Sequence, residues 1–343
     1  MSRIFKVSSS PHIKDNTDVK KIMKSVIIAL LPAFIGSLYF FGVRALIITA
    51  ISVITCVVTE AVVKKIMGKP VDVSDGSAVV TGILLAFNLS AGVSWWIPVI
   101  GGVFAIAVGK MTFGGLGYNP LNPALLGRVF LLFSFPVQMT TTWTVPSRFP
   151  GFDVQTTATP LNILKENAAI LNNRDMYSID AVNAAIQKVS DLSMSYFDLF
   201  TGNRSGCIGE TSVLLLLIGA AYLMYKRYIG WKIPFTYIAT VGILSWIFGG
   251  YEGLFTGPWL FHVISGGLIL GAFFMATDMV TSPVTFQGRI IFGIGCGVLT
   301  VIIRLVGGFP EGVSFAILLM NLTVPLLDRF SRPKVFGKAV KNA

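Results

Sequence analysis

The sequence predicts an all-α polytopic membrane protein, and its composition gives the first two observations. The chain of 343 residues is 54% hydrophobic and only 13% charged, whereas a soluble domain carries about 25% charged residues. The apolar residues also form long uninterrupted blocks, and several are long enough for a helix to cross a bilayer. The third observation is that lysine and arginine gather in the short loops and at the chain ends, as in membrane proteins.

Ten apolar spans of roughly helix-crossing length can be marked along the chain. They run at about 23–42, 43–63, 75–90, 95–110, 119–135, 210–225, 233–250, 259–277, 289–304 and 313–327. The spans divide the chain into an N-terminal segment (1–22), a five-helix unit (23–135), a long loop (136–209), a second five-helix unit (210–328) and a basic tail (329–343). Within the loop, 161–170 and 179–189 have the apolar spacing of helices.

The two five-helix units resemble each other. The run 102–110 compares with 297–304, since each ends in a basic residue and is followed by a Gly-Gly pair, and 81–87 compares with 266–273. Five helices is an odd number, so a duplicated copy would be inverted in the membrane, with a cavity between the halves. The alternative is that any two glycine-rich apolar helices look alike.

The distribution of basic residues predicts the orientation, because cytoplasmic loops carry the excess of Lys and Arg. With the N-terminus inside, the cytoplasmic side holds Arg3, Lys6, Lys14, Lys20, Lys21, Lys24, Lys64, Lys65, Lys69, Lys110, Lys226, Arg227, Lys232, Arg289, Arg329, Arg332, Lys334, Lys338 and Lys341. Both termini are therefore expected in the cytoplasm of a bacterium or archaeon and the loop 136–209 outside its inner membrane. No signal peptide is expected, because the first residues lack an apolar core.

The same distribution argues against nucleic acid as a partner. The net charge is +11, but the basic residues do not form an amphipathic face interleaved with aromatic residues. Cys56, Cys207 and Cys296 form no C-x-x-C pair, so no metal or iron–sulfur framework is expected on this chain. His12 and His262 are isolated.

Ionisable residues within membrane spans are candidates for a functional site. Glu60 and Asp328 are expected near the headgroups, where solvent reaches them. Arg128 lies deepest in a span and needs a counter-charge, backbone carbonyls or a bound anion to balance it.

A threonine-rich stretch stands in the long polar loop: Asp153-Val154-Gln155-Thr156-Thr157-Ala158-Thr159-Pro160-Leu161. Pro160 favours an extended backbone at Thr159. On composition alone the stretch is an ordinary loop. Its Thr-Ala-Thr-Pro-Leu run, however, resembles the flavinylation motif of a family that includes two membrane proteins. These are RnfD, of the Rnf ion-translocating ferredoxin:NAD oxidoreductase, and NqrB, of the sodium-pumping NADH:quinone reductase.

The resemblance implies that Thr159 carries FMN through a phosphoester bond. Thr157 stands where the family often has Gly or Ser. Thr156 and Thr157 would be placed to hydrogen-bond the phosphate. Asp153 would be a cap, part of what an FMN-attaching transferase reads, or a plain loop acid.

Three further motifs occur in the order in which the family has them. Asp75-Gly76-Ser77 begins the third span, and Tyr118-Asn119-Pro120-Leu121-Asn122-Pro123-Ala124 opens the fifth. The resemblance associates Asn119 and Asn122 with a non-covalent flavin, riboflavin, although Asn caps followed by Pro also explain the pattern. Gly209-Glu210-Thr211-Ser212 opens the sixth span, where Glu210, Thr211 and Ser212 either cap a helix or line the flavin site. A flavin phosphate is one of the anions that could balance Arg128.

Together these motifs imply an electron-transfer subunit of a redox-driven complex that moves Na⁺ or H⁺. The partners would be flavin- and iron–sulfur-carrying subunits of the Rnf complex. The chain has no Gly-rich nucleotide-binding turn, so NAD and ferredoxin are expected to bind elsewhere. The short N-terminus favours the Rnf protein over its quinone-reductase counterpart. A non-redox channel or transporter remains the alternative from another class, because fold alone does not decide function.

Overall fold

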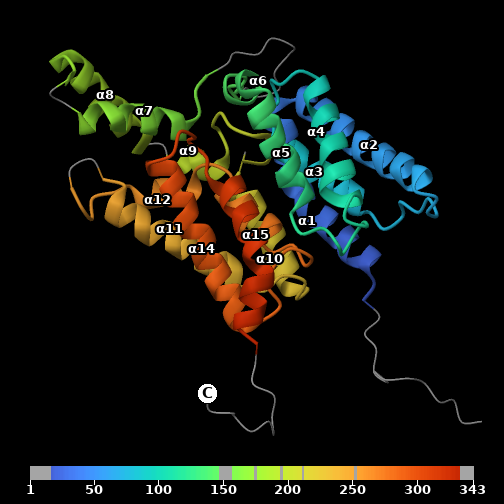
Figure 1. The fold of residues 1–343 in the computed structure, drawn as a ribbon. Coiled ribbons are helices and arrows are strands. Elements are labelled where there is room, and N and C mark those ends of the chain that lie inside the picture. Colours follow the sequence, from blue (N-terminus) through green and yellow to red (C-terminus); the bar gives the residue numbers. More distant parts are fainter. Residues whose placement is uncertain are drawn as a thin grey trace, which may run out of the picture.

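The computed structural model describes residues 17–146, 157–173, 176–193, 196–210, 212–250 and 253–332. Across these ranges the protein is built of helices and contains no β-strand. The chain forms two groups of long helices, with short helices gathered at one end of them (Figure 1). The first helix begins, and the last one ends, at the opposite end of the molecule (Figure 1).

The first group contains five helical segments. They are α1 (Val19–Phe41), α2 (Val43–Ile66), α3 (Ser77–Phe87), α4 (Trp96–Ile106) with its π-helical continuation η1 (Ala107–Met111), and α5 (Pro123–Ser134). Gly42 separates α1 from α2 with a φ of 63°, a backbone conformation that glycine adopts at little cost. Helices therefore occupy all five of the spans predicted for this half, with boundaries shifted by a few residues.

The second group contains α10 (Val213–Tyr225), α11 (Lys232–Phe248), α12 (Trp259–Ile264), α13 (Leu268–Leu270) with the π-helix η4 (Gly271–Met275), α14 (Phe286–Leu305) and α15 (Val313–Phe330). The span predicted at 259–277 is helical but not one continuous helix, because the segment breaks between α12 and α13. Gly266 lies in the break with a φ of 70°, which a regular helix does not allow. The break brings main-chain atoms into the interior beside the long loop.

Four helices are long and apolar enough to cross a membrane by themselves: α1, α2, α14 and α15. The remaining apolar helices, α3, α4 with η1, α5, α10 and α11, are shorter. In the first group α2 packs against α3 and α4, in the second α11 packs against α12 and α14, and α1 packs against α10 across the groups. The ten-span count and the inverted repeat stay predictions.

The segment between the groups folds into short helices: α6 (Pro136–Thr140), α7 (Pro160–Asn172), α8 (Ile179–Ser193), α9 (Tyr196–Thr201) and the 3₁₀ turn η3 (Ile208–Glu210). Helices α7 and α8 lie where the apolar spacing predicted them. Their apolar faces form a small core of their own, which Phe261 of α12 joins. This core fixes α7, and thus the threonine motif that precedes it, against the broken helix of the second group.

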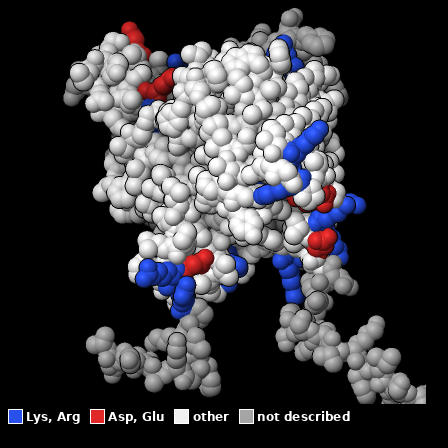
Figure 2. All heavy atoms as spheres, turned by 45° about the vertical axis from the view of Figure 1, so that its right-hand side comes forward, with Lys and Arg blue, Asp and Glu red and all other residues white. Residues whose placement is uncertain are grey.

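The charged residues are distributed unevenly over the surface. In the view of Figure 2, most of the visible face carries no charge, and lysine and arginine gather at the lower end and along the right-hand side. A wide uncharged face is the expected exterior of a protein in lipid.

Candidate functional site

Thr159 lies at the N-cap of α7. Its backbone is extended, with φ −69° and ψ 153°, as Pro160 at the first helical position requires. Its Oγ1 accepts a hydrogen bond from the Asn162 main-chain N–H at 3.3 Å. The residue is only 4% exposed, whereas Thr157, two residues earlier, is exposed. Among the described threonines of the motif, Thr159 is therefore the one turned into the protein.

The side chain of Thr159 lines a cavity that we call the threonine cavity. Its walls are Thr159, Pro160, Leu161, Leu199, Arg204, Ser205, Gly206, Glu210, Ile264, Ser265, Gly266 and Glu311. Ser205 Oγ donates a hydrogen bond to the Ala158 carbonyl at 3.0 Å. This bond positions the backbone directly before Thr159. The Ser265 hydroxyl is buried and has no hydrogen-bond partner among the described residues. A polar ligand in this cavity would give it one.

Several glycines lie in close contact with residues that line the threonine cavity. A Cβ on Gly266 would stand 2.7 Å from Leu161 Cδ1, and one on Gly267 would stand 3.1 Å from Glu210 Oε1. A Cβ on Gly206 would stand 3.0 Å from Glu210 Oε2. Side chains at these positions would press on Glu210 and Leu161, so the glycines let these two residues pack closely against the backbone at the cavity.

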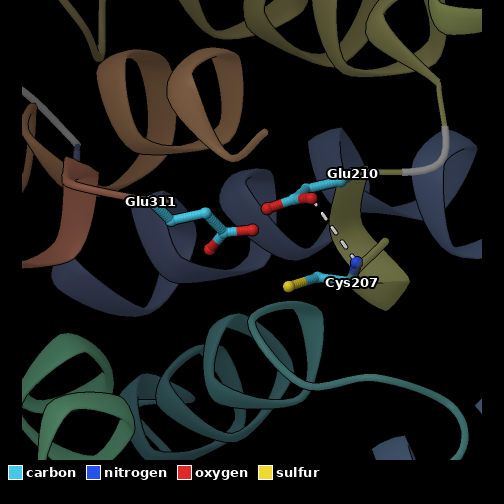
Figure 3. A group of neighbouring side chains, drawn as sticks. All are labelled: Cys207, Glu210 and Glu311. Atoms are coloured by element: carbon cyan, nitrogen blue, oxygen red, sulfur yellow. Dashed lines mark hydrogen bonds between the residues drawn. The ribbon is translucent and has the colours of Figure 1, made fainter. Parts of the chain in front are cut away.

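Two carboxylates and a thiol meet at the inner wall of this cavity (Figure 3). Glu210 ends η3, Glu311 precedes α15, and Cys207 lies just ahead of η3. Their Oε and Sγ atoms lie within 4.8 Å of one another, and the two carboxylates point toward each other (Figure 3). Glu210 accepts a hydrogen bond from the Cys207 main-chain N–H at 3.4 Å. The trio has the ligand types of a cation site, but a nearby arginine already supplies positive charge.

That arginine is Arg128 of α5, which is 6% exposed. It forms an ion pair with Glu311 and donates to Asn88 Oδ1 at 2.9 Å and to Ser314 Oγ at 2.7 Å. Its Nη2 also lies 4.0 Å from Cys207 Sγ. Of the balancing groups expected for Arg128, the structure therefore has the counter-charge, and it comes from Glu311.

The helix opening predicted at 209–212 has its cap at Ser212 in the structure. Ser212 is the N-cap of α10, and its Oγ accepts from the Leu215 N–H at 3.4 Å. Glu210 belongs to η3, before α10, so it does not lie in the first turn of that helix. Its carboxylate faces the threonine cavity instead. Asp153, Thr156 and Thr211 lie outside the described residues.

Basic residues from the connecting segment flank the threonine cavity. Arg204 lines it, and partial burial lowers the pKa of its guanidinium, while the Asp198 carboxylate acts in the opposite direction. Lys165 of α7 donates to the main-chain carbonyls of Gly307 and Phe309. Partial burial lowers the pKa of its ammonium group. Of these two, Arg204 puts positive charge beside Thr159 in the threonine cavity, and Lys165 lies farther along α7.

A second cavity, which we call the asparagine cavity, lies between the two helix groups near the start of α1. It is lined by Ile22, Met23, Val26, Ser77, Val80, Thr81, Leu84, Lys110, Leu116, Asn119, Asn122, Pro123, Ala124, Leu223, Tyr228, Ile229, Phe273, Phe274, Thr277, Asp278, Met279 and Val280. Most of these side chains are apolar, and a few polar groups stand among them. This is the composition of a site for a small organic ligand.

The two asparagines have different roles in that cavity. Asn122 caps α5, because its Oδ1 accepts from the N–H groups of Ala124 and Leu125 at 3.1 and 3.4 Å. Asn119 lies before the helix, which begins at Pro123 and thus later than the span predicted at 119–135. Its Nδ2 donates to the Leu121 carbonyl at 3.0 Å. Its Oδ1 is buried without a partner among the described residues and remains able to accept a hydrogen bond.

A buried charge network adjoins the asparagine cavity. Glu60, expected near the headgroups, is 1% exposed; the expectation that solvent reaches it is wrong. Its carboxylate contacts Lys64 Nζ and Lys110 Nζ, each at 2.6 Å, and Lys110 also donates to Ser77 Oγ at 2.6 Å. Glu60 is buried because α2, α3 and η1 meet around it, and hydropathy along one helix does not report such a meeting.

Sequence reasoning missed three residues of the threonine cavity, Arg204, Ser265 and Glu311, and Cys207 beside Glu210 and Glu311. Glu311 stands in an ordinary Pro-Glu-Gly turn, and 183 positions separate it from Arg128. A lone acid in a short loop is usually solvated. The one available signal was Arg128 itself, since an arginine inside a span requires a partner.

The fold defines the class of the protein: an all-helical membrane protein whose connecting segment carries a buried threonine over a polar cavity. Residues 6–337 match the NQR2, RnfD, RnfE family, and the chain belongs to that family.

Several relatives cover nearly the whole chain. The chain is 47% identical to the D subunit of the proton-translocating ferredoxin:NAD(+) oxidoreductase complex of Clostridium ljungdahlii, over 97% of this chain and 96% of the relative. It is 49% identical to the D subunit of the Na(+)-translocating ferredoxin:NAD(+) oxidoreductase complex of Acetobacterium woodii, over 96% and 95%. It is 40% identical to the D subunit of the ion-translocating oxidoreductase complex of Stutzerimonas stutzeri, over 95% and 94%.

Proposed function

We propose that this chain is the D subunit of an ion-translocating ferredoxin:NAD oxidoreductase complex and that it carries FMN covalently on Thr159. The proposal of the complex draws on family membership and on the printed names of relatives that match nearly the full length. Other subunits of that complex are then its partners, and NAD and ferredoxin bind on them. The cation is H⁺ or Na⁺, because relatives of similar identity are named for different ions.

The observation that carries the FMN proposal is the position of Thr159 Oγ1. It lies at the N-terminus of a helix of 13 residues, where free N–H groups and the helix dipole favour a phosphate. It also lines a cavity with Arg204, the unpartnered Ser265 hydroxyl and glycine-bordered space. The donor set therefore fits a phosphate-tethered flavin, which supplies one- and two-electron chemistry when bound.

Each group of the threonine cavity has a distinct task in this proposal. Thr159 holds the cofactor through an ester oxygen. Arg204 and the first N–H groups of α7 would offset the phosphate charge. Glu210 and Ser265 present an acceptor and a hydroxyl to a ligand in the cavity. The Arg128–Glu311 pair fixes the wall behind them, since a paired buried charge has a defined position.

The asparagine cavity is proposed as the site of a second, non-covalent flavin, riboflavin. Riboflavin has no phosphate, and this cavity offers apolar walls with Asn119 Oδ1 as a buried acceptor. The threonine cavity adjoins the start of α7, and the asparagine cavity adjoins the start of α1. Helix α7 and the start of α1 lie at opposite ends of the molecule (Figure 1). Two redox groups placed in this way would connect the two sides of a membrane.

The test is in-gel flavin fluorescence of the denatured complex, isolated from a host that contains the FMN-attaching enzyme. Wild type gives a fluorescent band at the mass of this protein, and Thr159→Ala abolishes it. Thr159→Ser retains a hydroxyl at the same place and keeps a band, and Thr157→Ala keeps the attachment atom. A dark wild-type band would refute the flavoprotein and favour a non-redox transporter. Mass spectrometry of the Thr159 peptide then checks for the added FMN mass.

A further inference from the structure

A third cavity lies farther along α7 than the threonine cavity, with Leu161 bordering both, and we call it the basic cavity. Its walls are Leu161, Leu164, Lys165, Ala168, Ala169, Asn172, Asn173, Phe248, Gly249, Gly250, His262, Arg304, Leu305 and Pro310. They come from α7, the end of α11, α12 and the end of α14. Arg304, Lys165 and His262 are basic, and the described walls contain no carboxylate. Neither the FMN nor the riboflavin proposal uses this cavity.

Arg304 is the buried charge of this cavity, with 4% of its surface exposed. Its Nη1 donates to the His262 carbonyl at 2.5 Å, and its Nη2 donates to the Ser265 carbonyl at 3.3 Å. No carboxylate of the described residues lies within ion-pair distance of it; Glu210 and Glu311 attract it only from farther away. Arg304 is thus held by main-chain dipoles and has no direct counter-ion in the described structure.

The contrast with Lys110 shows how unusual this is. Lys110, at the end of the helix that packs on α2, is equally buried but forms a 2.6 Å ion pair with Glu60 of α2. Arg304 ends α14, which packs on α11, and α11 contains no acidic residue. A buried charge without a partner is costly. Among the described residues, Lys110 therefore has a counter-ion within the chain and Arg304 has none within ion-pair distance.

Nitrogens without a partner lie beside the same space. Arg304 Nε, a donor, and His262 Nε2, a donor in one of the two neutral imidazole tautomers, are buried and have no hydrogen-bond partner among the described residues, and both residues line the basic cavity. Lys165 Nζ donates hydrogen bonds to the Gly307 and Phe309 carbonyls. One of its three N–H groups is then left to bond a ligand. A ligand that accepts several hydrogen bonds and carries negative charge would satisfy this set.

The surroundings identify where such a ligand comes from. The cavity opens past Asn172, Asn173 and Phe248, which are exposed. Trp246, near the C-terminal end of α11, is 45% exposed, and Trp259, at the start of α12, is 49% exposed. Exposed tryptophans at helix ends mark the headgroup level of a bilayer. Apolar walls beside a buried arginine at that level match a phosphate group joined to an acyl chain.

We infer that the basic cavity binds the headgroup of an anionic phospholipid, with Arg304 and Lys165 contacting its phosphate. Arginine and phosphate form strong charge-assisted hydrogen bonds, and the apolar side chains of Leu164, Leu305 and Phe248 pack against the lipid. The bound lipid would fasten α7 to α11 and α14. The threonine motif leads directly into α7, so this lipid would steady the segment that carries it.

The test is photo-cross-linking of the intact complex with a phosphatidylglycerol that carries a diazirine in its headgroup, followed by peptide mapping. Labelling is expected within 161–173 and 246–250. Arg304→Gln should lower the yield by about tenfold or more, the scale of one lost charge-assisted bond. Lys165 is half-buried at the mouth of the basic cavity, so Lys165→Gln should fold normally. It is expected to lower the cross-linking yield about threefold. Lys188→Gln, an exposed cation on α8, is the matched control and should change nothing.

Three comparisons distinguish the lipid from other anions. Unlabelled phosphatidylglycerol must displace the probe, whereas inorganic phosphate at the same concentration must not; displacement by phosphate would overturn the lipid assignment. Glu252, two residues beyond Gly250 in the sequence, lies outside the described residues, and the variant Glu252→Gln tests whether this acid competes with the lipid. Labelling that appears only in Glu252→Gln would show an internal counter-ion and refute the proposal. Thr159→Ala should keep full labelling, so failure of the FMN proposal leaves this result unaffected.

Discussion

Arg128 of α5 forms an ion pair with Glu311, which lies just ahead of α15. The two residues are 183 positions apart and belong to different helix groups. Both are largely buried. The pair therefore joins the two helix groups beside the threonine cavity. Its loss should lower both the stability of the protein and its cofactor content.

Removing one member of this pair is predicted to be more damaging than removing both. Arg128→Met leaves Glu311 buried without its partner and should cost about 3–5 kcal/mol. The double variant Arg128→Met/Glu311→Met should recover most of that loss, because no unpaired charge remains. Thermal unfolding of the purified protein in detergent measures both, with exposed Arg329→Met as the control. Equal loss in the single and double variants would contradict this.

The Glu60 network is predicted to be strongly asymmetric. Glu60→Gln leaves Lys110, which is 2% exposed, without a counter-charge, and a loss of about 3 kcal/mol or more is expected. Lys64→Gln removes the more exposed partner, at 16%, and should cost at most about 1 kcal/mol. The midpoints of thermal unfolding compare the two variants directly. A larger effect of Lys64→Gln would mean that Lys110 does not depend on Glu60.

Gly219 is predicted to be required for the contact of α10 with α1. A Cβ at this position would lie 1.9 Å from the Ala29 carbonyl oxygen, so even alanine forces the helices apart. Gly219→Ala should destabilise the protein by about 1–3 kcal/mol, as overpacking does. Gly308→Ala, which would meet no atom within 4 Å, is the matched control and should be tolerated. Unfolding midpoints in the same detergent decide between them.

The two asparagines of the asparagine cavity should separate in their effects. Asn122→Ala removes the α5 cap and should lower stability by about 0.5–2 kcal/mol. Asn119→Ala removes the unpartnered acceptor together with one hydrogen bond to the Leu121 carbonyl, so it should cost about 0.5–1.5 kcal/mol of stability and, unlike Asn122→Ala, should lower the flavin released on denaturation through the lost acceptor. Unfolding midpoints and extracted riboflavin measure the two effects. Retention of full riboflavin by Asn119→Ala would remove the support for this site.

The orientation predicted from charge can be tested with single added cysteines. The native cysteines, Cys56, Cys207 and Cys296, are all buried, so they give little background. In intact cells a membrane-impermeant thiol reagent should label Lys188→Cys on α8, and should label Arg329→Cys at the end of α15 only after the cells are opened. The reverse pattern would overturn the assignment of the loop to the outside.

Thr159 illustrates how far a local motif reaches. Its extended backbone follows from the next residue, Pro160, and its cap position follows from the apolar spacing of the helix after it. These are properties of neighbours in sequence, and the structure has both. The cavity beneath it is not such a property. It forms because α7 packs on α12, whose break at Gly266 no hydropathy pattern indicated.

By itself, the sequence determined that the protein is helical, where most of its apolar helices lie and that the backbone at Thr159 is extended, because hydropathy and turn preferences act over a few residues. Only the tertiary structure decided that Glu311 neutralises Arg128, that Glu60 is buried beside Lys110, and that Arg304 has no direct counter-ion among the described residues. Those outcomes depend on which helices meet. Pairing of buried charges is a property of contacts between distant segments, and it cannot be read from either segment alone.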